Sequence, residues 1–253
     1  MRVISVMNLK GGVGKTTTVV NMAAILARDY DKKVVVIDAD PQANATDFFK
    51  LRGRNGLYAW YSDSEQDPAD PLDYIHHTDI PGVSIIPAEI DLVNIDIDDS
   101  YGNGSITFIA DLCSALSDGT DADFVLIDCP PCFTTTSCAA LYASDDVIIP
   151  VKPDGFVASG LMELDRQLAA LRRLNQSIIV AGALITMWHN SEAVNAGTMA
   201  LRDQNEVPVF RTMIRRSDKV DESTLARQTL DEWSPYSAAG RDYRAFVAEY
   251  LGV

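Results

Sequence analysis

Residues 10–17 (KGGVGKTT) hold the strongest chemical signal of the sequence, because two lysines and two threonines surround three glycines there. Glycines let a backbone turn tightly and point its N–H groups at an anion. Lys15 can then reach the β- and γ-phosphates of a nucleotide, and the Thr16 hydroxyl can ligate Mg²⁺. The segment therefore predicts a phosphate-binding loop.

The loop departs from the usual G-x-x-x-x-G-K-[ST] pattern, since Leu9 stands where that pattern has its first glycine. An additional lysine, Lys10, lies inside the loop. A glycine-rich turn without a ligand is the alternative interpretation, but it leaves the clustered lysines and threonines unexplained.

Three aspartates follow predicted strands. Asp38 and Asp40 come after the β-branched run 34–37, and Asp128 comes after the run 124–127. The carboxyl ends of strands form the ligand crevice of an open α/β sheet. A carboxylate there can hold the Mg²⁺ shell or orient an attacking water. A strand-end aspartate alone is more often a turn or cap residue, so the functional interpretation depends on the loop in the same chain.

These residues meet only if a sheet positions them. Continuous apolar runs predict buried parallel strands at residues 3–7, 34–37, 124–127, 147–149 and 178–185. Helical patterns separate or follow them at residues 15–28, 107–116, 135–143, 159–174, 191–204 and 237–251. The alternation predicts an α/β fold with a mostly parallel twisted sheet flanked by helices on both faces. We expect residues 1–253 to form one domain.

The composition is that of a globular protein, with 47% hydrophobic and 23% charged residues. No apolar run approaches the roughly 18 residues that span a bilayer. The four cysteines show no disulfide framework, so we expect a reduced, cytoplasmic protein.

Charge is distributed unevenly. Lys and Arg number 21 and Asp and Glu 36, a net charge of −15, yet residues 55–151 contain 18 of the acids and no lysine or arginine. The remaining segments therefore carry 21 − 18 = +3. This net charge disfavours broad coating of DNA, but a small cationic face could still bind it.

The best local candidate for a DNA-binding face is the group Arg211, Arg215, Arg216 and Lys219. Three further cations could join it: Lys152, Arg172 and Arg173. A solvated helix start with scattered ion pairs is the alternative.

The sequence resembles the ParA/MinD family of deviant Walker A ATPases, and within it the ParA (Soj-like) partition branch. The specific matches are the loop 10–17, Asn21, and the runs 38–46 (DADPQANAT) and 127–131 (IDCPP). Softer matches are 149–151 (IPV), Gly160-Leu161, 209–215 (VFRTMIR) and Asp242-Tyr243. The resemblance implies a P-loop NTPase fold.

The resemblance also implies roles for single residues. Lys10 would reach across an ATP-bound homodimer to the partner's phosphates. Lys15 and Thr16 would bind phosphate and Mg²⁺ within the subunit, and Thr17 would lie near the α-phosphate. The rest of the cofactor-binding loop would be Gly11, Gly12, Val13 and Gly14.

Further roles follow from the same resemblance. Asp40 would position the hydrolytic water, Asp38 would support the Mg²⁺ site and Asp128 would be the Walker B acid. Adenine contacts would come from the strand end at Met187 and from the turn near Pro208.

The family also implies slow hydrolysis of ATP, a dimer that binds DNA without sequence preference, and a ParB-like partner that triggers release. Such a protein would be nucleoid-associated. We expect the segment 55–151, which lacks lysine and arginine, to face a basic segment of that partner.

Three alternatives stay open. The net charge favours a ParA-like ATPase that positions a non-DNA cargo. An iron–sulfur or redox member of the superfamily would use Cys129 and Cys132, two thiolates per subunit. A MinD-like membrane role needs a basic amphipathic C-terminal helix, whereas residues 241–251 (RDYRAFVAEYL) are typical of a packing helix. We therefore expect no membrane partner.

Overall fold

Eight strands form a single sheet in the computed structural model, which describes residues 1–64, 70–97, 106–154, 163, 166, 168–173, 175–203 and 207–253. The strand order is β3-β4-β2-β5-β1-β6-β7-β8, and within these described ranges only the pair β3–β4 is antiparallel. The strands are β1 (Arg2–Val6), β2 (Val34–Asp38), β3 (His76–His77), β4 (Val83–Ile86), β5 (Phe124–Asp128), β6 (Asp146–Val151), β7 (Ile179–Trp188) and β8 (Val209–Arg215).

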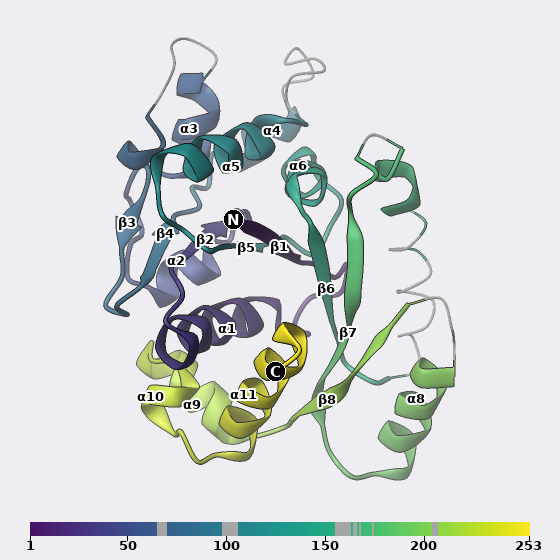
Figure 1. Cartoon of the computed structure of the whole chain (residues 1–253). Helices are drawn as coiled ribbons and strands as arrows, with labels where there is room; N and C mark the ends of the chain where they lie inside the picture. The colour runs from purple at the N-terminus through teal and green to yellow at the C-terminus, as the bar shows by residue number, and fades with distance from the viewer. Residues whose placement is uncertain are drawn as a thin grey trace.

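Helices cover both faces of the sheet, as predicted (Figure 1). One face carries α1 (Lys15–Tyr30), α2 (Asn44–Phe48), α9 (Asp218–Ala226), α10 (Leu230–Trp233) and α11 (Ala238–Leu251). The other carries α3 (Leu57–Ser64), α4 (Leu92–Ile97), α5 (Phe108–Gly119) and α6 (Thr135–Ala143). A 3-10 turn at Pro71–Asp73 contacts α5, and α8 (Glu192–Asp203), which follows β7, contributes Leu201 to the core beneath α5 and α6.

The sheet separates two apolar cores. In β2, Val34 and Val36 pack on the side of α1, whereas Val35 and Ile37 pack on the side of α5 and α6. A parallel strand covered on both faces needs apolar residues at every position. This explains why the run 34–37 is continuous rather than alternating.

Most predicted elements are present, with shifts of a few residues at their ends. The helix predicted at 135–143 coincides with α6. Much of the predicted helix 159–174, together with Gly160-Leu161 and Gln204, lies outside the described residues. The prediction missed the strands β3, β4 and β8 and the short helices α2, α3, α4, α9 and α10.

Helix α11 covers the free edge of β8. Glu249 accepts the backbone N–H groups of Arg211 and Thr212 at 2.7 and 2.8 Å, and Asp242 accepts that of Arg215 at 2.9 Å. The apolar side of α11, including Tyr243 and Phe246, is buried. The C-terminal helix is therefore a packing helix, as predicted. None of the helices in the described ranges is long and apolar enough to cross a membrane.

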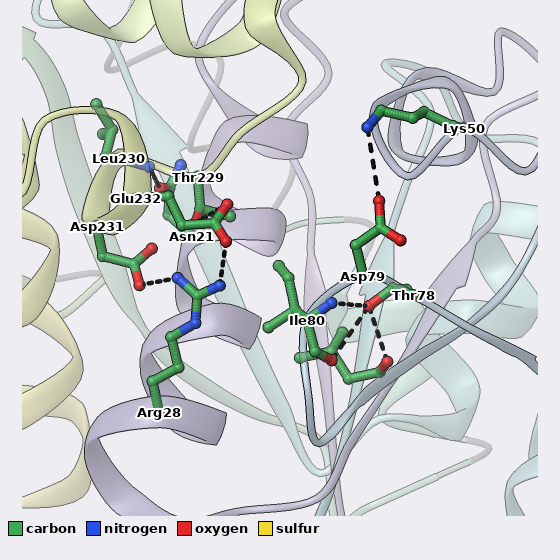
Figure 2. Close-up of polar contacts among 11 residues, drawn as sticks. Asn21, Arg28, Lys50, Thr78, Asp79, Ile80, Thr229, Leu230, Asp231 and Glu232 are labelled. Carbon is green, nitrogen blue, oxygen red and sulfur yellow. Dashed lines mark hydrogen bonds and ion pairs between the residues drawn. The ribbon is translucent and has the colours of Figure 1, made fainter.

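Polar contacts fasten α1 to α10 (Figure 2). Asn21, only 2% exposed, donates to the carbonyl of Thr17 and accepts the N–H of Leu230, both at 2.8 Å. Arg28, further along α1, pairs with Asp231 and Glu232. Asn21 thus joins the first turn of α1 to the C-terminal part of the chain.

Asn21→Ala is expected to lower the free energy of unfolding by about 1–3 kcal/mol, because the buried N–H of Leu230 loses its acceptor. Urea unfolding followed by circular dichroism measures the change. The matched control is Asn94→Ala on the exposed side of α4, which should change stability by no more than about 0.5 kcal/mol. Equal losses in the two variants would contradict the role given to Asn21.

Candidate nucleotide-binding site

The loop between β1 and α1 contains two glycines in left-handed backbone conformation. Gly12 has φ 69° and Gly14 has φ 90°, a region that side chains disfavour. A Cβ added at Gly11 or Gly12 would meet nothing within 4 Å, so this side of the loop is open. Gly14 begins α1, and none of the described side chains caps the helix there. The first N–H groups of α1 can therefore bind an anion.

Lys15 is the buried cation of the loop. Its side chain belongs to a residue that is 8% exposed, and its Nζ donates to the carbonyl oxygen of Lys10 at 3.2 Å. Burial lowers the pKa of Lys15, and the charges of Asp128 and Asp40 act against that shift. A polyphosphate at the loop would supply further negative charge beside this ammonium and so stabilise its protonated form.

Thr16 and Asp128 form an oxygen-rich pair beneath the loop. Thr16 Oγ1 donates to Asp128 Oδ2 at 2.6 Å, and Asp128 is 1% exposed. The second oxygen, Oδ1, is buried and has no hydrogen-bond partner among the residues that the structure describes. Burial, and then the charge of Asp38, raises the pKa of Asp128. A hydroxyl beside a carboxylate with an unpartnered oxygen fits Mg²⁺, which binds oxygen ligands.

Both carboxylate oxygens of Asp38 accept hydrogen bonds from the segment that follows it in the chain. Its Oδ2 accepts both the N–H and the hydroxyl of Thr46 at 2.8 Å, and its Oδ1 accepts the N–H of Asp40 at 3.2 Å. Burial raises the pKa of Asp38 to about 6. Both oxygens therefore hold residues 40–46 in place, and the support of the Mg²⁺ site by Asp38 stays a prediction.

Asp40 lies at the open side of the site. It is 7% exposed, and its Oδ1 accepts the N–H of Gln42 at 2.9 Å. Together with Gly12, Lys15 and Thr16 it lines a cavity of about 450 Å³. The structure therefore brings together the loop and the strand-end carboxylate that the sequence places 25 residues apart.

Lys10 points away from Lys15 and pairs with Asp154, three residues beyond β6. The side chain of Lys10 is 46% exposed and that of Asp154 is 29% exposed. The backbone N–H of Lys10 donates to Asn8 Oδ1 at 2.9 Å, which orders the loop. Sequence analysis missed Asp154, since no motif in this chain marks it.

A second cavity of about 300 Å³ adjoins the loop. Its lining includes Gly14, Thr17, Lys152, Thr186, Met187 and Arg216. Thr186 Oγ1 donates to the carbonyl oxygen of Val13 at 2.8 Å and so ties the loop to β7. Met187 has φ 53°, which turns the chain at the edge of this cavity. Met187 thus lines a cavity beside the loop, and its contact with adenine stays a prediction.

Pro208 is wrong as a nucleotide contact. It precedes β8, and its carbonyl oxygen accepts the N–H of Ala183 at 2.7 Å, in the middle of β7. Since β7 and β8 are parallel, Pro208 lies at the far end of β8 from the loop. The residue that follows β8, Arg216, lines the cavity instead.

Comparison with known proteins agrees with this geometry. A family model described as an AAA domain matches residues 1–180. The chromosome-partitioning ATPase Soj of Thermus thermophilus is 32% identical over 99% of this chain and 96% of its own length. The sporulation initiation inhibitor protein Soj of Bacillus subtilis is 30% identical over 98% and 97%. This chain belongs to the ParA/Soj family of ATPases.

Solved structures share the fold of this chain. A Mycobacterium smegmatis cobyrinic acid a,c-diamide synthase with a bound ATP analogue and magnesium is 27% identical, with a TM-score of 0.84 over 99% of this chain and 94% of that one. The ATP complex of Cyanothece McdA(D38A) has a TM-score of 0.87 at 22% identity, over 100% and 97%, and shows the shared fold alone.

The cationic group predicted for DNA binding is divided in this ParA/Soj family member. Arg215 donates to Asp242 at 2.6 and 2.8 Å, and Lys219 pairs with Glu222 at 2.7 Å. Arg211 lines a separate cavity near the beginning of β8. The four cations therefore do not form one continuous surface, and their binding of DNA stays a prediction. Two cations remain beside the second cavity, namely Lys152 and Arg216.

Two further arginines proposed for that patch lie elsewhere. Arg172 Nε donates to the carbonyl of Ile178, just before β7, and Arg173 follows it in the chain. The amino ends of the parallel strands lie at the opposite edge of the sheet from the loop, so these two residues cannot extend the site.

The structure also contradicts the iron–sulfur interpretation. Cys129 is 0% exposed at the end of β5, and burial raises the pKa of its thiol to about 12. Cys132 is exposed. A cluster shared between two subunits needs both thiolates at the surface, and Cys129 cannot reach it.

Lys15→Ala is expected to weaken ATP binding by at least about 100-fold, because the buried ammonium can no longer form charge-assisted hydrogen bonds to phosphate oxygens. Isothermal titration calorimetry with excess Mg²⁺ measures the affinity. The control Lys50→Ala breaks an exposed pair with Asp79 and should leave the affinity unchanged. Wild-type affinity in Lys15→Ala would refute the assignment of the loop.

Proposed function

We propose that this chain is an ATP-dependent switch of the partition type. It binds Mg-ATP, dimerises, hydrolyses ATP slowly, and couples this cycle to non-specific DNA binding and to segregation of DNA or cargo. The carrying observation is that Lys15, Thr16 and the unpartnered oxygen of Asp128 meet beneath an open glycine loop. These are the groups that a phosphoryl-transfer site requires. Relatives named as chromosome-partitioning proteins support the partition class.

Each group at the loop has a distinct task in this proposal. Thr16 and Asp128 would hold Mg²⁺, which when bound neutralises charge on the phosphate oxygens. Lys15 and the loop amides would bind the phosphates, while Met187 and Arg216 would border the base. The synthase that binds an ATP analogue with magnesium, at 27% identity, supports ATP and Mg²⁺ as the ligands.

Asp40 would orient the water that attacks the γ-phosphate. Its carboxylate borders the phosphate cavity and accepts a hydrogen bond from the N–H of Gln42. This hydrogen bond fixes the orientation of the carboxylate without neutralising its charge. A positioned carboxylate can orient a water and accept its proton.

Lys10 would connect the nucleotide to dimerisation. Both members of its pair with Asp154 are accessible, and exposed ion pairs are weak, so Lys10 can exchange partners. The triphosphate of a second subunit offers more negative charge than one aspartate. Each Lys10 would then complete the partner's site, so that ATP binds the dimer better than the monomer and shifts the population.

DNA and a protein activator would bind different surfaces. Among the residues that the structure describes, Lys152 and Arg216 form no ion pair with a carboxylate, and a dimer would double the number of these cations. A ParB-like activating partner would present its basic segment to residues 55–151, which contain 18 acidic residues and no lysine or arginine. Such a protein would act in the cytoplasm, associated with the nucleoid.

A second candidate function keeps the switch and changes the cargo. The net charge of −15, together with the pairing of Arg215 with Asp242 and of Lys219 with Glu222, leaves little free positive surface for DNA. These observations favour a ParA-like ATPase that positions a non-DNA complex.

The wild-type protein should sediment as a dimer with ATP and as a monomer with ADP or without nucleotide. Lys10→Ala should bind ATP normally in calorimetry but remain monomeric in analytical ultracentrifugation, because the ammonium that crosses the interface is missing. Lys33→Ala, on an exposed turn, is the control and should dimerise. An ATP-dependent dimer of Lys10→Ala would contradict the trans role.

Asp40→Ala should retain ATP and lower its hydrolysis at least about 100-fold, because the positioned carboxylate is lost.

The ATP-bound dimer of Asp40→Ala allows DNA binding to be measured without turnover of the nucleotide. Retention on immobilised DNA should require ATP and fall steeply between about 50 and 200 mM salt. Arg216→Ala should weaken retention, whereas Arg173→Ala should not. No retention even at the lowest salt would favour the non-DNA cargo.

A further inference from the structure

Arg227 is an exposed cation that the fold holds in an unusual backbone conformation. It ends α9 with φ 53°, a region that glycine adopts more easily than arginine. Its backbone N–H closes the helix on the carbonyls of Ser223 and Thr224. A glycine would serve this turn equally well, so the turn does not require the side chain.

The end of α9 faces the phosphate loop. Thr224 and Arg227 line the same cavity of about 450 Å³ as Gly12, Lys15 and Thr17. Figure 1 shows α9 on the face of the sheet that α1 covers. The C-terminal part of the chain therefore forms one wall of the site whose opposite wall is the glycine loop.

The charge of Arg227 is not neutralised by its surroundings. It acts on Asp47 of α2, whose pKa is lowered chiefly by Arg52 and to a smaller extent by Arg227. Arg52 already holds Asp47 through two hydrogen bonds of 2.7 and 2.6 Å. Within the described ranges, the guanidinium of Arg227 has no hydrogen bond or ion pair. Arg52 thus pairs with Asp47, and the positive charge of Arg227 remains available at the cavity.

We propose that Arg227 is a phosphate-binding residue of the nucleotide site, contributed in cis by the C-terminal part of the chain. The inference rests on the proposed ATP site and adds a cation to it. A guanidinium presents paired N–H donors that match phosphate oxygens. Unlike Lys10, Arg227 acts within its own subunit, so it raises the nucleotide affinity of the monomer before any dimer forms.

Arg227→Gly tests this proposal without disturbing the turn, since glycine accepts φ 53° and the thermal unfolding midpoint should not fall. Calorimetry on the full chain with excess Mg²⁺ compares ATP, ADP and AMP. The variant should lose at least about tenfold in affinity for ATP, as expected for one charge-assisted hydrogen bond. The loss should be smaller for ADP and absent for AMP, and Arg227→Lys should recover part of it.

Arg241→Ala is the matched control, because it removes one positive charge from the exposed side of α11. It should bind all three nucleotides as the wild type does. Unchanged ATP affinity in Arg227→Gly, or equal losses for ATP and AMP, would overturn the phosphate-binding role. A wild type that binds no ATP would overturn the proposed function itself, and the wild-type titration separates that failure from the first.

Discussion

The central constraint on this molecule is that an open glycine loop with a buried ammonium must be held still at the middle of a sheet. A loop of this kind has few side chains of its own to pack. Its order comes from neighbours: Thr186 of β7 binds the carbonyl of Val13, and Asn8 donates to the carbonyl of Pro150 at 2.7 Å. Because β1 lies between β5 and β6, the ends of several strands meet around the loop and supply its carboxylates.

The parts of this site that the sequence could predict are those encoded locally. The glycine spacing at 10–17 and the aspartates after apolar runs are short-range patterns, and a parallel sheet brings the carboxyl ends of its strands together without further information. The site therefore contains Lys15, Thr16, Asp40 and Asp128 in one place, as expected. The strands missed were those with polar residues inside them, such as Arg211 and Thr212 in β8.

What the sequence could not reveal depends on pairings across long separations. The partner of Lys10 lies 144 residues away, and Arg215 of β8 pairs with Asp242 of α11, 27 residues further along the chain. Pro208 was misplaced because the direction and register of β8, rather than its composition, decide which end reaches the nucleotide cavity. Charge counted along a chain is thus a poor guide to charge presented on a surface.

The carboxylates of α11 that bind the backbone of β8 have a consequence for self-association. An unpaired strand edge is a template on which another chain can polymerise. Here Glu249 and Asp242 occupy amide groups of β8, and the opposite border of the sheet is the two-residue strand His76–His77. Neither border offers a long ladder for continuation into a fibre. A dimer of the proposed kind would therefore form through side chains and loops rather than through a shared sheet.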